Sequence, residues 1–235
     1  MSKAQSQRIQ TSLLNPYEKV VLVWIASRLP KWVKSDHLTA FGVLGAVVIA
    51  LGYTLTAYGS GWLWLASFGF VMHWLGDSLD GTIARVRNTQ RPIYGFYIDH
   101  NLDCVCELLM VGGAGLSPYL NMWSSLLVVV PYLMLEVYVM INAHLKSEFK
   151  LTYSKLGPTE FRLVIILVNT IIFFSDTLRE WSMHITPMGY DVTIRTLDIV
   201  CLTFSVILFV MYFNSLYSDA KYFSKLDPLK KNEAN

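Results

Sequence analysis

Charged residues are scarce in this chain. They make up 15% of its 235 residues, whereas hydrophobic residues make up 54%. An ordinary soluble domain carries about 25% charged residues. A disordered chain needs the opposite balance, and a soluble globule could not cover this much apolar surface with so few charges. The composition therefore excludes both classes and predicts an integral membrane protein, with a length that suits one compact domain.

Cysteine is also scarce. The chain has three, Cys104, Cys106 and Cys201, and all of them lie in apolar stretches. An odd number at these spacings provides neither a disulfide framework nor a zinc-binding motif. We therefore interpret the three as small buried residues.

Long apolar runs are what the sequence has in abundance. Six of them are separated by turn residues: 38–58, 62–75, 95–116, 120–143, 158–175 and 192–216. A helix needs about 20 residues to cross the hydrocarbon core of a bilayer, so each run is long enough or nearly so. The predicted fold class is all-α integral membrane, with six transmembrane helices in residues 36–217. An N-terminal helical segment, 1–35, precedes them, and a cytoplasmic tail, 218–235, follows.

Basic residues are distributed unevenly around these runs. Most of the 19 Lys and Arg lie before the first run, between the second and third, between the fourth and fifth, or after the sixth. By the positive-inside rule, both termini and the 85–95 loop face the cytoplasm. The expected localisation is a cytoplasmic-type membrane, with a site near this loop open to the cytoplasm.

The N-terminal segment does not resemble a signal peptide, because its apolar stretch is short and no small-residue cleavage site follows it. Residues 15–18, Asn-Pro-Tyr-Glu, instead indicate the start of a helix, with Asn15 as the cap and Glu18 reaching back to it. Trp24 and Trp32, with basic residues nearby, suit a helix in the cytoplasmic interface of the membrane. A helix shielded against the protein's own spans is the alternative.

Four carboxylates lie where carboxylates are costly. Asp77 and Asp80 follow the second apolar run, and Asp99 and Asp103 lie in the third. An acidic residue inside a span costs about 2.5–3.5 kcal/mol on insertion scales. Spacings of three and four place each pair on one helical face, and a short loop lets the two faces meet. Because oxygen ligands suit Mg²⁺, Mn²⁺ or Ca²⁺, we predict a metal site, with pairing to the arginines of residues 85–91 as the alternative.

Small and basic residues adjoin these acids. Gly81 and Ala84 leave room for a ligand to approach the helix backbone, although close helix packing demands the same residue types. Arg85, one turn further on, can offer planar donors to a phosphate or serve only as an inside-facing anchor.

The combined pattern is Asp77-x-x-Asp80-Gly81-x-x-Ala84-Arg85 and, after nine residues, Gly95-x-x-x-Asp99-x-x-x-Asp103. It resembles the signature of the CDP-alcohol phosphotransferase family. The resemblance implies a six-helix membrane fold, a homodimer and an active site that opens to the cytoplasm. Residues 35–39, Ser-Asp-His-Leu-Thr, match the family's lead into the first span only loosely.

The same resemblance implies the site residues. Two divalent cations, Mg²⁺ or Mn²⁺, are expected as cofactors. Their expected ligands are Asp77, Asp80, Asp99 and Asp103. The residues expected to bind the CDP portion of the donor are Asp77, Gly81, Ala84, Arg85 and Gly95.

A base is needed to take the proton of the acceptor alcohol. Asp103 is the family's usual candidate, but a carboxylate bound to a metal is a weak base. His100 carries an imidazole, which is better matched to proton transfer near neutral pH. A hydrogen-bonded structural histidine is the alternative for His100.

Three further residues are candidates for binding the acceptor or the head group: Glu107, Glu160 and Arg162. Glu107 shares a helical face with the acids of the third run. Glu160 opens the fifth run, where stabilisation of the helix dipole is the alternative role. Arg162 can meet a phosphate or a lipid head group, or it can act as a snorkelling anchor.

The predicted function is an enzyme that transfers a substituted phosphoryl group from a CDP-alcohol to an acceptor alcohol, with release of CMP, in phospholipid synthesis. Asp99-His100 and Thr159-Glu160 resemble the family's choline/ethanolamine branch. They favour a CDP-choline or CDP-ethanolamine donor and a lipid acceptor such as diacylglycerol, which arrives from the bilayer. The alternative is CDP-diacylglycerol with a soluble acceptor such as inositol phosphate or glycerol phosphate. A membrane prenyltransferase or an ion transporter is more remote, and no nucleic-acid partner is expected.

Overall fold

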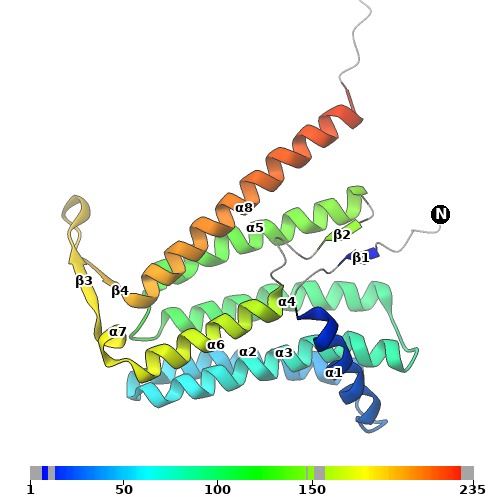
Figure 1. Ribbon diagram of the computed structural model, residues 1–235, viewed down its shortest axis with the longest axis horizontal. Coiled ribbons are helices and arrows are strands. Elements are labelled where there is room, and N and C mark those ends of the chain that lie inside the picture. The colour runs from blue at the N-terminus through cyan, green and yellow to red at the C-terminus, as the bar shows by residue number, and fades with distance from the viewer. Residues whose placement is uncertain (1–6, 10–13, 147, 151–156, 229–235) are drawn as a thin grey trace, which may run out of the picture.

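The computed structural model describes residues 7–9, 14–146, 148–150 and 157–228 (Figure 1). Helices dominate these ranges, and two short strand pairs accompany them. The helices are α1 (Asn15–Arg28), α2 (Ser35–Leu55), α3 (Leu63–Val86), α4 (Pro92–Gly115), α5 (Met122–Lys146), α6 (Pro158–Phe174), α7 (Asp176–Glu180) and α8 (Thr196–Leu226). The strands are β1 (Gln7–Ile9), β2 (Glu148–Lys150), β3 (Ser182–Ile185) and β4 (Val192–Arg195). Short 3₁₀ turns cover Thr56–Tyr58, Ser60–Trp62 and Pro187–Gly189.

Helix α3 continues beyond the second apolar run, from Leu75 to Val86, so Asp77 and Asp80 lie inside one unbroken helix, as their predicted helical face requires. Hydropathy falls at the acids, whereas the hydrogen-bonded backbone does not stop there. The sixth run, 192–216, differs from the structure at both ends. Val192 starts β4, which pairs antiparallel with β3, and α8 continues to Leu226, into the segment that was predicted to be the tail.

Three segments are long and apolar enough to cross a membrane, among the residues that the structure describes. They are Ser35–Tyr58, Met122–Leu145 and Thr196–Leu226. The other long helices fall short by composition or length, because α3 and α4 carry the acids and α6 has 17 residues. The all-α membrane class is therefore confirmed, while the count of six spans stays a prediction.

Helices α2 and α3 pack at backbone contact, and glycines make this possible. A Cβ atom built on Gly76 would overlap the backbone of Gly42, and one built on Gly45 would lie 2.5 Å from the backbone nitrogen of His73. Small residues at such crossings are the usual means by which membrane helices approach closely. The contact fixes the α3 turn that carries Asp77.

Replacing Gly76 with Ala should therefore destabilise the protein by about 1–3 kcal/mol, the usual cost of overpacking. The measurement is the thermal unfolding midpoint of the detergent-solubilised protein. Gly112→Ala on α4 is the matched control, because a Cβ atom there meets nothing within 4 Å. Equal midpoints for the two variants would contradict this account of the α2–α3 contact.

Helix α1 packs on the bundle with one face. Leu22 and Ala26 are buried in a cluster with residues of α2 and α3, whereas Val20 and Trp24 are exposed. The packed face is what the shielded alternative predicted, and the exposed apolar face suits the membrane interface. Leu14 precedes the helix as its cap residue, so the prediction that Asn15 is the cap was wrong. The backbone N–H of Leu14 donates to Oε1 of Glu160, at 3.0 Å, because the α6 start lies beside it.

Polar contacts hold both ends of the bundle. At the end that holds α7, Asp198 is fully buried at the start of α8 and accepts hydrogen bonds from the backbone N–H groups of Asn121 and Arg195, both at 2.8 Å. At the other end, the guanidinium of Arg87 donates to the carbonyl oxygens of Leu29 and Pro30, at 2.7 and 3.0 Å. These contacts fix α5 against α8 and the α1–α2 linker against the end of α3.

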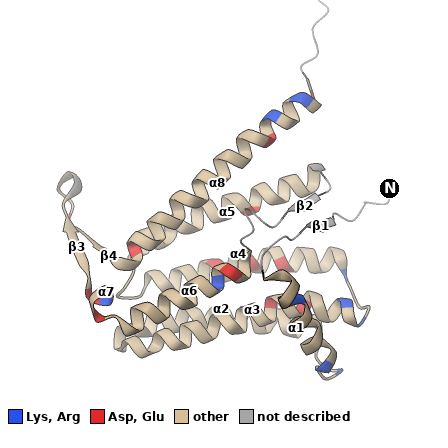
Figure 2. Cartoon of the chain, viewed as in Figure 1, with Lys and Arg blue, Asp and Glu red and all other residues tan. Residues whose placement is uncertain are grey.

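Charged residues are distributed unevenly along the bundle. Figure 2 shows Lys and Arg around α1, the α3–α4 turn and the far end of α8, with others beside α7 and on α6, while several Asp and Glu lie midway along the bundle. This distribution is the one that the positive-inside argument expects, and the orientation itself stays a prediction.

Candidate active site

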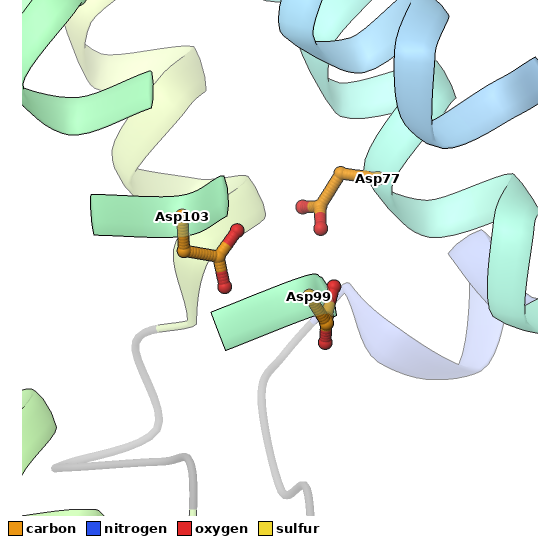
Figure 3. A group of neighbouring side chains, drawn as sticks. All are labelled: Asp77, Asp99 and Asp103. Atoms are coloured by element: carbon orange, nitrogen blue, oxygen red, sulfur yellow. The ribbon is translucent and has the colours of Figure 1, made fainter. Parts of the chain in front are cut away.

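Three of the four predicted acids converge. Asp77 of α3 and Asp99 and Asp103 of α4 each offer one carboxylate oxygen, and these oxygens all lie within 4.8 Å of one another. Figure 3 shows the three side chains gathered between the two helices. Spacing on each helix, together with the short α3–α4 connection, was enough to predict this convergence. Carboxylate oxygens grouped in this way form a donor set suited to hard divalent cations.

Asp80 lies at the wall of the same cavity but outside the three-acid cluster. Its Oδ2 accepts a hydrogen bond from Oγ1 of Thr39, at 2.7 Å, and its Oδ1 accepts one from the backbone N–H of Gly81. The hydroxyl of Ser35 donates to its backbone oxygen, at 2.9 Å. Ser35 and Thr39 thus orient Asp80 from α2, a role that the loose match at residues 35–39 did not reveal.

The cavity is narrow, and its lining is mixed. All four acids reach it, together with residues of α2, α3 and α4. These are Thr39, Gly42, Val43, His73, Leu102 and Cys106. His73 was interpreted as structural, and its Nδ1 lies 3.1 Å from the carbonyl oxygen of Gly42, which fits that interpretation. Its place beside the acids could not be read from the sequence.

Arg162 reaches the cluster from α6. Its Nη2 lies 2.6 Å from Oδ2 of Asp77, and the two side chains are 14% and 27% exposed. A snorkelling anchor would direct its charge toward water, so this partly buried ion pair does not fit that alternative. The contact joins residues 85 positions apart and was not predicted.

The residues expected to bind the nucleotide lie along the second half of α3 and the start of α4. The guanidinium of Arg85 folds back over Gly81, where a Cβ atom would lie 3.3 Å from Nη1, and Nη2 donates to Thr82, at 3.0 Å. Ala84 is buried, as close helix packing requires. Gly95 is exposed, with open space where a Cβ would be. Their nucleotide-binding role stays a prediction.

His100 lies beside the cluster and not in the lining of its cavity. Its Nδ1 is 2.8 Å from the carbonyl oxygen of Phe96, and the two rings are in contact at 4.2 Å between centroids. A carbonyl only accepts, so Nδ1 carries the hydrogen and the lone pair of the neutral ring resides on Nε2. This tautomer is compatible with a base, and the role of His100 stays a prediction.

A second pair of acids adjoins the first cluster. Glu107 of α4 faces Glu136 of α5, whose Oε2 accepts a hydrogen bond from the thiol of Cys104, at 3.3 Å. Within the described part of the chain, Oε2 of Glu107 is buried and has no hydrogen-bond partner. Unpartnered buried oxygens are uncommon in folded proteins.

Glu160 has different surroundings from Glu107. Its two carboxylate oxygens accept the backbone N–H groups of Leu14 and Gly157, at 3.0 and 2.9 Å. These contacts give it the helix-start role that was the alternative, and a role toward the head group stays a prediction. Beside it, the hydroxyl of Thr159 donates to the carboxylate of Glu18, at 3.0 Å.

Glu18 lies in the first turn of α1, as predicted, but its side chain does not reach back to cap the helix. Its Oε1 accepts hydrogen bonds from Nε1 of Trp74 and the hydroxyl of Ser78, at 2.7 and 3.1 Å, in addition to the bond from Thr159. One carboxylate on α1 therefore ties α3 to α6, on the two α3 turns that flank Asp77. No motif in the sequence signals such a tertiary contact.

Comparison with known proteins agrees with this geometry. Residues 32–210 match the family described as CDP-alcohol phosphatidyltransferase. Cholinephosphotransferase 1 of Homo sapiens is 22% identical over 200 residues, which cover 79% of this chain and 49% of that protein. The protein of the same name from Gallus gallus is 24% identical over 207 residues, covering 81% and 61%. That of Danio rerio is 25% identical over 192 residues, covering 77% and 48%.

The chain thus spans about half the length of the human and zebrafish relatives that it matches. The family match takes in α2 to α7 and about the first half of α8, and with them the whole pattern from Asp77 to Asp103. With the acids of that pattern gathered at one cavity, the chain belongs to the CDP-alcohol phosphatidyltransferase family, and the resemblance to its choline/ethanolamine branch is confirmed.

Proposed function

We propose that this protein transfers a substituted phosphoryl group from a CDP-alcohol to an acceptor alcohol and releases CMP. The observation that carries the proposal is the convergence of Asp77, Asp99 and Asp103 on one cavity. In the reaction, the acceptor oxygen forms a bond to the phosphorus that carries the non-cytidine alcohol. The bond from that phosphorus to the bridging diphosphate oxygen breaks, and the acceptor proton passes to a base.

The roles of the residues follow from their positions. Asp77, Asp80, Asp99 and Asp103 would hold two divalent cations, Mg²⁺ or Mn²⁺. When bound, such cations neutralise the diphosphate and the charge that develops on the leaving group. Arg85 and the small residues of α3 would position the CDP portion. His100 would take the acceptor proton through Nε2, with Asp103 as the alternative base.

Charge around the cavity favours a cationic head group on the donor. Glu107 and Glu136 form an acidic wall next to Asp103, and one buried oxygen of Glu107 lacks a partner among the described residues. An ammonium or quaternary ammonium group would complement this wall. These acids support choline or ethanolamine in the donor.

The basic residues do not favour the opposite direction. A soluble acceptor such as inositol phosphate would require cations for its phosphate. Arg87 is bound to carbonyl oxygens of the α1–α2 linker, Arg91 lies 3.9 Å from Asp36, and Arg162 pairs with Asp77. We therefore propose a lipid hydroxyl such as that of diacylglycerol as the acceptor, with CDP-diacylglycerol as donor to a soluble alcohol as the alternative.

Protection against heat separates this function from the remote alternatives. With Mg²⁺ present, CMP or CDP-choline should raise the unfolding midpoint of the purified protein, because a ligand that binds the native state stabilises it by mass action. A prenyl diphosphate should not. Protection by the prenyl diphosphate and none by CMP would indicate a prenyltransferase, and protection by neither would contradict the proposal.

The membrane topology and the oligomeric state of the enzyme are part of the same proposal. Six spans, cytoplasmic termini and a cytoplasmic opening fit the distribution of basic residues in Figure 2. A site partway into the bilayer would be reached by the nucleotide from water and by the lipid from the side. The homodimer that the family resemblance implies completes the proposed organisation.

A further inference from the structure

Arg162 contacts the acid cluster directly. Its guanidinium pairs with Asp77 at 2.6 Å, and Asp103 and Tyr132 are close enough to interact with it electrostatically. The arginine lies on the first turns of α6, so a single side chain from a separate helix reaches the carboxylates of α3 and α4. It supplies positive charge where several acids would otherwise repel one another.

The carboxylate of Asp77 cannot bind the guanidinium of Arg162 and a divalent metal ion at the same time without a loss of affinity. Asp77 is a proposed metal ligand, and its Oδ2 is held by Arg162 in this structure. A guanidinium and a divalent cation within a few ångströms repel strongly, since even two unit charges 4 Å apart interact by several kcal/mol near a protein surface. Metal binding at Asp77 therefore requires Arg162 to move away. If Arg162 stays in place, the affinity for the metal is lower.

The backbone that carries Arg162 is fixed, whereas its side chain is long. Glu160 ties the start of α6 to the N–H of Leu14, and Thr159 ties it to Glu18. These anchors hold the Cα of Arg162 in place. Rotation about the side-chain bonds of Arg162 is then sufficient to release Asp77.

We propose that Arg162 is a displaceable counter-cation of the cluster, which holds Asp77 in the metal-free protein and releases it when divalent cations bind. The inference rests on the proposed metal-binding role of the acids. It goes further by making Arg162 a competitor of the metal. In the metal-free state Arg162 stabilises the fold by compensating the partly buried acids, and in the same state it lowers the affinity for metal.

The test measures Mn²⁺ binding to the detergent-solubilised full chain without nucleotide, from the electron paramagnetic resonance signal of free Mn²⁺. For Arg162→Met, the Mn²⁺ dissociation constant should fall at least about tenfold, because the competing charge is gone. Arg162→Lys keeps a cation and should stay within about threefold of wild type. Arg179→Met is the matched control, because Arg179 pairs with Asp176 at the α7 end of the bundle, away from the cluster, and it should leave the Mn²⁺ dissociation constant unchanged.

Stability gives a second readout. Metal-free Arg162→Met should unfold at a lower temperature than wild type and gain more from Mn²⁺. If Arg162→Met does not yield folded protein, Arg162→Gln tests the same point, since it removes the charge and keeps a polar side chain. In the Asp77→Asn background, removal of Arg162 should no longer tighten Mn²⁺ binding.

Mn²⁺ binding by Arg162→Met, or by Arg162→Gln in its place, that equals or is weaker than wild-type binding would overturn the inference. If CMP release remained metal-dependent in that case, the proposed function would stand and only the role of Arg162 would fall. A wild-type protein that binds no Mn²⁺ would overturn both.

Discussion

Asp99→Asn should lower the rate of CMP release from a CDP-alcohol by about a thousandfold or more. Asp99 contributes one of the three carboxylate oxygens of the cluster, and an amide oxygen carries no charge to replace it. Loss of metal-based charge stabilisation removes several kcal/mol from the transition state, and each 1.36 kcal/mol is a factor of ten in rate. The measurement is the initial rate of CMP formation in proteoliposomes with saturating donor and Mg²⁺. EDTA should abolish CMP formation by the wild-type protein.

The matched control is Asp36→Asn. Asp36 lies at the start of α2, is largely exposed, and is 3.9 Å from Arg91, outside the cavity lining. Its replacement removes the same charge from the same side of the protein and should leave the rate within about twofold, as expected for an exposed pair. An Asp99→Asn enzyme with normal turnover, or a wild type indifferent to EDTA, would refute the metal-site account.

His100→Ala should lower turnover by about 10²–10⁴-fold while leaving donor binding nearly unchanged. The contact with Phe96 places the hydrogen on Nδ1 and the lone pair on Nε2, the arrangement that a base requires. A neutral hydroxyl in the acceptor needs such a base, whereas the CDP portion of the donor does not. The measurements are kcat for CMP release and the dissociation constant of CDP-choline.

The split between kcat and binding distinguishes a base from a structural histidine. A histidine that only packs on Phe96 would, when removed, lower stability and binding together. His144→Ala on α5 is the control, because His144 is exposed, and both quantities should stay near wild type. Turnover of His100→Ala within about threefold of wild type would assign the base to another residue, with Asp103 the first candidate.

The local part of the site could be predicted from the sequence because its geometry is helical. Spacings of three and four fixed which acids share a face, and the short connection of α3 to α4 brought Asp77, Asp99 and Asp103 together. Cys106 is buried, as its apolar surroundings predicted, whereas Cys104 and Cys201 are only partly buried. Periodicity carries this information within one helix and across one short turn.

Contacts between distant segments could not be predicted in the same way. The pairing of Arg162 with Asp77 and the three-way contact of Glu18 depend on how α6 and α1 pack against α3. The orientation of the Asp80 side chain could not be predicted either, because it depends on a hydrogen bond from Thr39 of α2.

The most direct test of the central claim is lipid mass spectrometry of proteoliposomes that contain the purified protein, Mg²⁺ and a panel of CDP-alcohols and acceptors. The account predicts CMP and a new phospholipid bearing choline or ethanolamine when CDP-choline or CDP-ethanolamine meets diacylglycerol. The Asp99→Asn protein in the same vesicles should form neither product. New phospholipid only from CDP-diacylglycerol with a soluble alcohol would contradict the proposed direction, and no CMP from any donor would contradict the enzyme itself.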